Sequence, residues 1–382
     1  MIRVAMIAHL AELSGSGRAL VDAAAHLDPG EFQPEIILPA PGDLAAEAAR
    51  AGVAWSVEPN PEVSLAGTHP WALPGLAARR VGYVWRLARR LRAGRFHLAC
   101  INTTASVFAG FAARLARLPV LWRVHEVLDN PSRGTRAKMW IVEHLSTGIM
   151  YDSATGERCF PAPSVPHRLV MRNHVNPKAF GPWRRKPETV ASLGIQPGET
   201  VIVANGPFPR KGADVFLAAA ATVAGRSERP LRFVLLGPET PEHADFCRRL
   251  RAEAETPPLR GRVTFAGLRR DVADILACSD IFVSPSRNEA WPIIILEAMA
   301  TGLPVVATRV GDCADMLDGG RRGLLVAPGD AQALAGAIEQ IIAQPEEARK
   351  RAQAATEWIS QTFGTPDYWH PLEQLIRRVA AS

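Results

Sequence analysis

Short apolar runs alternate with amphipathic stretches along all 382 residues of the chain. Runs that predict buried strands lie at residues 2–8, 35–38, 53–57, 97–101, 120–124 and 148–151, and again at 201–204, 232–237, 262–265, 280–284, 304–307 and 324–326. Helical patterns fill the intervals between them. Such alternation is typical of parallel sheets with helices on both faces. We therefore expect an α/β protein made of two Rossmann-like units.

A segment rich in turn formers and charge separates the two halves. It covers residues 173–187 and contains prolines at 177, 182 and 187. A chain of this length exceeds what one hydrophobic core usually supports, so two domains are the default expectation. The sequence predicts an N-terminal domain at 1–172, a hinge at 173–187, a C-terminal domain at 188–362 and a terminal segment at 363–382.

Two glutamates eight residues apart flank a predicted strand-to-helix junction in the second half. Residues 285–288 carry the turn signal, and Pro292 suits the first position of a helix that we expect to end near residue 300. Glu289 then lies in the loop at the carboxyl end of the strand, and Glu297 projects from the second helical turn. The N–H groups of residues 293–295 would be unpaired and able to receive an anion. Carboxylates that accept hydrogen bonds from hydroxyls, beside N–H groups that donate hydrogen bonds to a phosphate, suit a nucleotide sugar.

A basic pair follows the first strand of this second half. Arg210 and Lys211 precede Gly212 where a strand ends and a helix is expected to begin. Lysine supplies a mobile point charge and arginine a planar fork of donors, a combination suited to a diphosphate. Taken singly, such a lysine is often a surface residue at a helix entry, and a spaced glutamate pair is often two solvated side chains.

Together these residues resemble a known family. Glu289 to Glu297, followed by Ala-Met-Ala-Thr-Gly-Leu-Pro-Val-Val-Ala-Thr, resembles the Glu-x7-Glu signature of the retaining glycosyltransferases of family 4 (group 1), and the likeness continues to Asp330. Lys211-Gly-Ala-Asp resembles the family's Lys-Gly-x-Asp motif, with Gly206 where many members carry arginine. The resemblance implies the GT-B fold, in which two Rossmann-like domains face each other across a cleft. It also implies that residues 363–382 cross back to the first domain.

The resemblance further implies a set of functional residues. Donor contacts are expected from Arg210, Lys211, Gly206, Leu268, Glu289, Ala290, Trp291, Ile293, Ile294 and Glu297. Glu289 would orient sugar hydroxyls, Glu297 would bind the ribose, and Lys211 would hold the phosphates. His125, at the end of an apolar strand, resembles the histidine that contacts the transferred sugar. Glu289, His125 and Lys211 are thus the expected catalytic residues.

A glycine-rich stretch after the first strand belongs to the same expectation. Gly15, Ser16 and Gly17 follow the first strand and are expected to open a helix, with their N–H groups facing the crevice. The resemblance implies that a glycine-rich loop at this point meets the donor phosphate or the acceptor. As a dinucleotide fingerprint the stretch is weak, because Leu20 replaces the third glycine.

The reaction implied is glycosyl transfer with retained anomeric configuration. The donor would be a nucleotide-diphosphate sugar, and the acceptor a glycan or lipid-linked molecule of a bacterial cell envelope or exopolysaccharide pathway. No cofactor and no metal are expected. Two alternatives stay open: a nucleotide-sugar epimerase or hydrolase on the same fold, which would convert its donor without an acceptor, and a non-catalytic glycan-binding protein, which would bind no nucleotide diphosphate.

Charge is distributed unevenly. Net charge is +6 with a pI near 9.4, and residues 51–175 hold 16 Lys and Arg against 7 Asp and Glu. A predicted amphipathic helix from Arg79 to Arg95 carries much of this excess. It suits peripheral contact with an anionic membrane or an anionic acceptor, although a solvated basic face is equally compatible. No nucleic-acid motif is present.

The cysteine content and the hydropathy of the chain indicate the cellular compartment in which the protein is expected. The five cysteines show no metal-site spacing and are odd in number, which favours reduced thiols. The apolar start of the chain is too short for a signal peptide, and no run reaches the length of a membrane helix. We expect a cytoplasmic protein, and the inner face of the cytoplasmic membrane is a candidate place of action.

Overall fold

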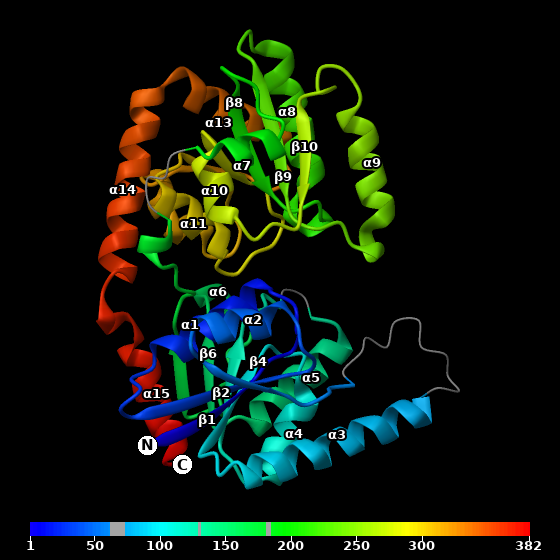
Figure 1. Cartoon of the computed structure of the whole chain (residues 1–382), viewed down its shortest axis with the longest axis vertical. Helices are drawn as coiled ribbons and strands as arrows, with labels where there is room; N and C mark the ends of the chain where they lie inside the picture. The colour runs from blue at the N-terminus through cyan, green and yellow to red at the C-terminus, as the bar shows by residue number, and fades with distance from the viewer. Residues whose placement is uncertain (62–72, 129–130, 181–184) are drawn as a thin grey trace. The chain divides into compact units, whose positions relative to one another are not determined.

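The computed structural model describes residues 1–61, 73–128, 131–180 and 185–382, and the chain divides into two compact units (Figure 1). Unit 1 comprises Met1–His174 together with Pro366–Ser382, and unit 2 comprises Val175–Thr365. The predicted hinge at 173–187 begins where the two units meet in sequence, and its residues 181–184 lie outside the described part. Of the terminal segment at 363–382, the residues from Pro366 onward pack with unit 1.

Unit 1 is built on a seven-stranded parallel sheet in the order β3-β2-β1-β4-β5-β6-β7. Its strands are β1 (Ile2–Ile7), β2 (Phe32–Leu38), β3 (Ala54–Val57), β4 (Leu98–Asn102), β5 (Val120–Val124), β6 (Gly148–Tyr151) and β7 (His167–Val170). Its helices are α1 (Gly15–His26), α2 (Asp43–Arg50), α3 (Leu73–Ala93), α4 (Val107–Leu115), α5 (Arg133–Leu145), α6 (Ala154–Cys159) and α15 (His370–Ala380), the last preceded by a short 3-10 turn, η6 (Pro366–Trp369).

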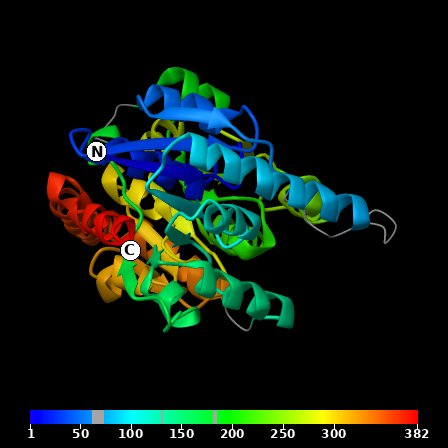
Figure 2. The ribbon, with the colours of Figure 1, turned by 90° about the horizontal axis from the view of Figure 1, so that it is seen from below.

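Helices cover both faces of this sheet because alternate strand residues are apolar on each side. Val4 and Met6 point to the layer of α1, α2 and α15, whereas Ala5 and Ile7 point to the layer of α3, α4 and α5. Figure 1 shows the two layers, and Figure 2, seen from below, shows α3 passing beside α4. The C-terminal α15 belongs to the first layer since its apolar positions all fall on one stripe: Leu372, Leu375, Ile376 and Val379.

Unit 2 contains a six-stranded parallel sheet in the order β10-β9-β8-β11-β12-β13. Its strands are β8 (Thr200–Asn205), β9 (Leu231–Leu236), β10 (Val263–Gly267), β11 (Ile281–Ser284), β12 (Val305–Thr308) and β13 (Leu324–Val326). Its α-helices are α7 (Pro187–Ser192), α8 (Ala213–Arg226), α9 (Ala244–Ala254), α10 (Val272–Ala277), α11 (Ile293–Thr301), α12 (Cys313–Met316), α13 (Ala331–Ala343) and α14 (Pro345–Phe363). Short 3-10 turns occur at Pro177–Ala179, Pro209–Lys211, Pro241–His243 and Asp318–Gly320.

The core of unit 2 lies between the sheet and the helices α8 and α13. Ile202 and Ala204 of β8 pack there with Phe216 of α8 and Ile338 of α13. The helix α11 contacts β11 and β12 and is in turn covered by α14. This arrangement holds α11 against the carboxyl ends of the central strands.

Besides small shifts of the strand ends, two elements differ from the sequence prediction. The basic helix, predicted from Arg79 to Arg95, runs from Leu73 to Ala93, and Arg95 has a φ of 51°. The strand β7 was not predicted, because it is only four residues long and half-buried, with His167 and Arg168 at its start.

Two further features of the fold concern its helices and its cysteines. Within the described ranges, no helix has both the length and the apolar composition required to cross a bilayer. Four of the five cysteines are buried.

Candidate active site

In unit 2, the loops that follow β8 and β11 meet where the strand order reverses. Carboxyl ends of parallel strands lie on the same sheet edge, and ligands of such folds bind at this reversal point. Gly212, with a φ of 70°, lies so close to the second loop that a Cβ there would be 2.0 Å from the carbonyl oxygen of Pro285. The Arg287 guanidinium pairs with both carboxylate oxygens of Asp214 at 2.7 Å. The two loops therefore form one fixed structure.

Glu289 lies in this structure between the two predicted cations. Its side chain is 8% exposed, and its Oε1 accepts hydrogen bonds from Lys211 Nζ at 2.5 Å and Ser286 Oγ at 2.9 Å. Its Oε2 lies 3.4 Å from Arg210 Nη1, which also donates to the carbonyl of Asn288. Burial by itself raises the pKa of Glu289, but the charges of Lys211 and Arg210 and the hydrogen bonds outweigh it and hold the pKa below its usual value.

The second glutamate is positioned by α11. Glu297 lies in the second turn of this helix and is 1% exposed, while Ile293 and Ile294 in the first turn are half-buried. Pro292 was expected at the first helical position, but with a ψ of 113° it is extended and occupies the N-cap. The N–H of Ile295 was expected to be unpaired, yet it donates to the carbonyl of Pro292 at 3.1 Å because the first turn is tight.

The remaining donor-site candidates differ in their accessibility. Leu268, after β10, is 62% exposed, and Gly206, after β8, has a φ of 50° that favours glycine. Ala290 and Trp291 are buried, and the Trp291 ring packs edge-on against Trp358 of α14, with 6.4 Å between ring centroids. The Trp291 ring is thus part of the core, and only its main chain is placed for a donor contact.

In unit 1, the glycine-rich stretch opens a helix, as expected. Gly15, Ser16 and Gly17 form the first turn of α1, and Ser14 caps the helix. The Ser14 Oγ accepts from the N–H of Gly17 at 3.1 Å, so this N–H is already paired. A Cβ at Gly17 would approach Leu44 to 3.2 Å, which explains the glycine by packing.

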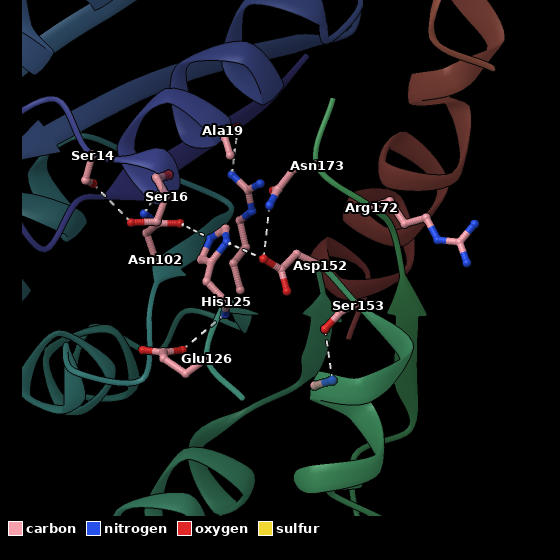
Figure 3. A network of polar contacts seen from close by, with 12 residues as sticks. Ser14, Ser16, Ala19, Asn102, His125, Glu126, Asp152, Ser153, Arg172 and Asn173 are labelled. Carbon is pink, nitrogen blue, oxygen red and sulfur yellow. Dashed lines mark hydrogen bonds and ion pairs between the residues drawn. The ribbon is translucent and has the colours of Figure 1, made fainter. Parts of the chain in front are cut away.

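His125 directly follows β5, as predicted, and both of its ring nitrogens have polar neighbours (Figure 3). Nε2 lies 2.8 Å from Asn102 Oδ1, and Nδ1 lies 3.3 Å from Asp152 Oδ2. Asp152 Oδ2 also accepts from Asn173 Nδ2 at 3.0 Å, and Asn102 Nδ2 donates to the carbonyl of Ser16 at 3.1 Å. These residues come from the ends of neighbouring strands and from the first turn of α1.

Sequence reasoning missed Asn102, Asp152, Asn173 and Ser286. Each is a polar residue at or shortly after the carboxyl end of a parallel strand. That position was the available signal, because parallel strands bring such residues together at one sheet edge. Among the residues that the structure describes, no group of three or more His, Cys, Asp or Glu side chains is arranged to hold a metal ion.

Comparison with known proteins agrees with this geometry. Residues 199–344, which contain both loops of the unit 2 site, match the family model described as glycosyl transferases group 1. The lipopolysaccharide core biosynthesis mannosyltransferase LpcC of Rhizobium leguminosarum bv. viciae is 29% identical over 299 residues, which cover 77% of this chain and 81% of that protein.

Solved structures resemble the whole chain. Anabaena Alr3699/HepE in complex with UDP and glucose has a TM-score of 0.83 at 20% identity, with both chains covered completely. The sucrose-phosphate synthase of Thermosynechococcus elongatus has a TM-score of 0.78, also at 20% identity and full coverage of both chains. These likenesses and the two parallel sheets show a GT-B fold, and the match over residues 199–344 supports a group 1 glycosyltransferase.

Proposed function

We propose that this protein is a retaining glycosyltransferase of family 4 that moves a sugar from a nucleotide-diphosphate sugar to a glycan or lipid-linked acceptor. The observation that carries the proposal is the cluster of Lys211 and Arg210 around the buried Glu289, at the strand-order reversal of unit 2. Cations and a hydroxyl-binding carboxylate meet there, within the segment that matches the group 1 family model.

Lys211 and Arg210 would hold the donor diphosphate. When the sugar leaves, negative charge grows on the nucleoside diphosphate, and preformed cations stabilise that charge. In the structure both cations are compensated by Glu289. A bound diphosphate would therefore draw Lys211 away from Glu289 and leave that carboxylate to accept sugar hydroxyls. Glu297 on α11 would bind the ribose.

We propose that no divalent metal takes part in the transfer. A metal in such reactions neutralises the leaving phosphates, and here the ammonium of Lys211 and the guanidinium of Arg210 supply two positive charges at the same place. Activity that persists in excess chelator would support this point, and activity restored only by Mg²⁺ or Mn²⁺ would contradict it.

A cell-envelope glycan is the proposed acceptor class. LpcC, a relative that covers 77% of this chain, is named for lipopolysaccharide core biosynthesis, and HepE was solved with UDP and glucose. We propose a hexose donor and an envelope or exopolysaccharide acceptor on these grounds.

Unit 1 offers a surface for an anionic membrane. Residues 63–125 contain ten arginines and no acidic residue. On α3, Val81 and Trp85 are 58% and 55% exposed, and Arg89 continues the same helical stripe. Trp140 on α5, in the same helix layer, is 60% exposed. Exposed aromatic rings among arginines suit an interface of anionic lipid headgroups, so we propose that the protein works in the cytoplasm at such a membrane surface.

A screen of nucleotide sugars by thermal shift tests the proposal. We expect one nucleotide sugar to raise the melting temperature, and Glu297→Ala to reduce that shift strongly. The exposed Glu357→Ala on α14 is the control that should leave it unchanged. The proposal fails if no nucleotide sugar stabilises the protein, which would favour a non-catalytic glycan-binding protein, or if Glu297→Ala changes nothing.

A further inference from the structure

His125 lies in a row of side chains contributed by four neighbouring strands. Asn102 ends β4, His125 follows β5, Asp152 follows β6 and Asn173 comes after β7 (Figure 3). The His125 and Asp152 side chains are 9% and 4% exposed. The row is therefore fixed by the sheet and largely shielded from water.

The orientation of the Asn102 amide determines whether the Nε2 nitrogen of His125 carries a proton. Its Nδ2 donates to the Ser16 carbonyl at 3.1 Å, and a carbonyl oxygen only accepts. The amide orientation is thereby settled, and its Oδ1 faces His125 Nε2 at 2.8 Å. Since Oδ1 also only accepts, Nε2 carries a proton.

The other ring nitrogen faces a carboxylate. His125 Nδ1 lies 3.3 Å from Asp152 Oδ2, and this oxygen already accepts from Asn173 Nδ2 at 3.0 Å. Without a proton between Nδ1 and Oδ2, two lone pairs would oppose each other in a buried place. A carboxyl group is a stronger acid than an imidazolium, and the buried guanidinium of Arg123 interacts electrostatically with Asp152. The proton therefore belongs on Nδ1.

The main chain of His125 is fixed as well. Its N–H donates to Glu126 Oε2 at 3.1 Å, and Glu126 Oε1 accepts from both the N–H and the Oγ1 of Thr104, at 2.9 and 3.0 Å. Ring and backbone are thus held from opposite sides.

We propose that Asn102 and Asp152 are positioning residues that hold His125 with a proton on each ring nitrogen. His125 then serves sugar transfer through its orientation and positive charge. It takes no proton from the acceptor. With both nitrogens donating, neither retains a lone pair for general base catalysis. This inference rests on the proposed glycosyl transfer for its kinetic consequence, but the hydrogen-bond assignment stands on unit 1 alone.

Nitrogen NMR of protein labelled with ¹⁵N-histidine tests the assignment. The chain has ten histidines, and His125→Gln identifies the two signals to follow. We expect both ring nitrogens of His125 to be protonated at neutral pH. In Asp152→Asn, a near-isosteric change that removes the carboxylate charge, one of the two ring nitrogens of His125 should lose its proton at neutral pH. An unprotonated Nδ1 in the parent protein, or an identical spectrum for Asp152→Asn, overturns the proposal.

Kinetics of the same variants test the consequence. Asp152→Asn should lower kcat about tenfold, as for one lost charge-assisted hydrogen bond, and leave KM for the donor within about twofold, because the proposed donor site lies in unit 2. Asn102→Leu, which removes the acceptor at Nε2, should lower kcat as well. Glu143→Gln on α5, which removes a carboxylate elsewhere in unit 1, is the control. A parent protein that turns over no nucleotide sugar refutes the proposed function, and the NMR result then decides the assignment of His125 alone.

Discussion

At the scale of single residues, the candidate site depends on how the negative charge of the buried Glu289 carboxylate is balanced. A buried carboxylate is costly unless it is paired and hydrogen-bonded, and here Lys211, Arg210 and Ser286 all contribute. The cluster is therefore internally paired in the structure. In the proposed mechanism Lys211 would exchange Glu289 for phosphate, and this exchange would link the stability of the fold to donor binding.

Replacing Lys211 by alanine should weaken the binding of the nucleoside diphosphate about 10- to 100-fold. The variant loses a charged hydrogen bond to the phosphate in a poorly hydrated site. Isothermal titration calorimetry with the donor found in the thermal-shift screen measures the change. Lys350→Ala on α14, an exposed lysine paired only with Glu347, should bind as the parent does, and equal losses in both variants would contradict the assigned role of Lys211.

The pKa of Glu289 predicts how stability depends on pH. Because pairing holds this pKa below the ordinary value of 4.5, the ionised carboxylate stabilises the folded state at neutral pH, and this contribution disappears as pH falls through the folded-state pKa. Urea unfolding should show that Glu289→Gln lowers the free energy of unfolding at pH 7 and that the deficit shrinks below pH 4.5. Glu357→Gln serves as the exposed control. A deficit that is constant over this range would refute the account.

Only part of this site was predictable from the sequence. The nearness of Glu289 to Lys211 followed from the rule that both lie after central parallel strands. That Trp291 turns its ring inward did not follow, since its partner Trp358 lies in a helix 67 residues later, and no local pattern reports such a contact. The same holds for Asn102 and Asp152, whose contacts with His125 span 23 and 27 residues.

At the scale of elements, the two loops of the unit 2 site are joined by close backbone approach. Gly212 near Pro285, and Gly311 near Glu289, both lie where a Cβ would be about 2 Å from a carbonyl oxygen. These glycines set the separation between the strand ends and hence the position of Glu289. The geometry of the loops is therefore as important for the site as its charges.

Gly212→Ala should destabilise the protein by roughly 3 kcal/mol or more, since strain at positive φ adds to a backbone clash. Gly194→Ala is the matched control: its φ of 67° is similar, but no atom lies within 4 Å of its Cβ position, so only the strain of roughly 1 kcal/mol should appear. Thermal or urea unfolding of the two variants checks the difference. Equal effects would mean that the loops are not held together by this contact.

Strands were the elements best predicted from sequence. Three of the twelve predicted strands, at 120–124, 148–151 and 324–326, coincide with observed ones, and the other nine differ by one to three residues at one or both ends. This agreement arises because buried parallel strands are continuous apolar runs. Helix starts were harder to predict: Pro292 was expected at the first helical position of α11, but it is extended and occupies the N-cap.

At the scale of the whole molecule, surface charge and exposed aromatic rings separate the two units. Unit 1 carries the acid-free stretch 63–125 and three large exposed hydrophobic side chains on α3 and α5, namely Val81, Trp85 and Trp140. Residues 175–365, which form unit 2, are almost balanced at 23 basic and 22 acidic residues. We therefore expect membrane contact to be a property of unit 1 and donor binding a property of unit 2.

Vesicle sedimentation tests this division. The protein should bind vesicles containing phosphatidylglycerol and not pure phosphatidylcholine, and binding should weaken with salt. The double variant Trp85→Ala and Trp140→Ala should lose about tenfold in vesicle affinity while its nucleotide affinity is unchanged. Trp55→Ala, at a tryptophan of β3 that is 40% exposed, should bind vesicles as the parent does. Equal binding to both kinds of vesicle would refute the proposed surface.

The most direct test of the central claim is acceptor-dependent turnover of the nucleotide sugar. The parent protein, given this donor and a lipid extract, should release nucleoside diphosphate rapidly only when the extract is present, and the product should keep the donor's anomeric configuration. Lys211→Ala should abolish most of this release. Complete conversion of the donor without any acceptor would instead identify an epimerase or hydrolase and contradict the account.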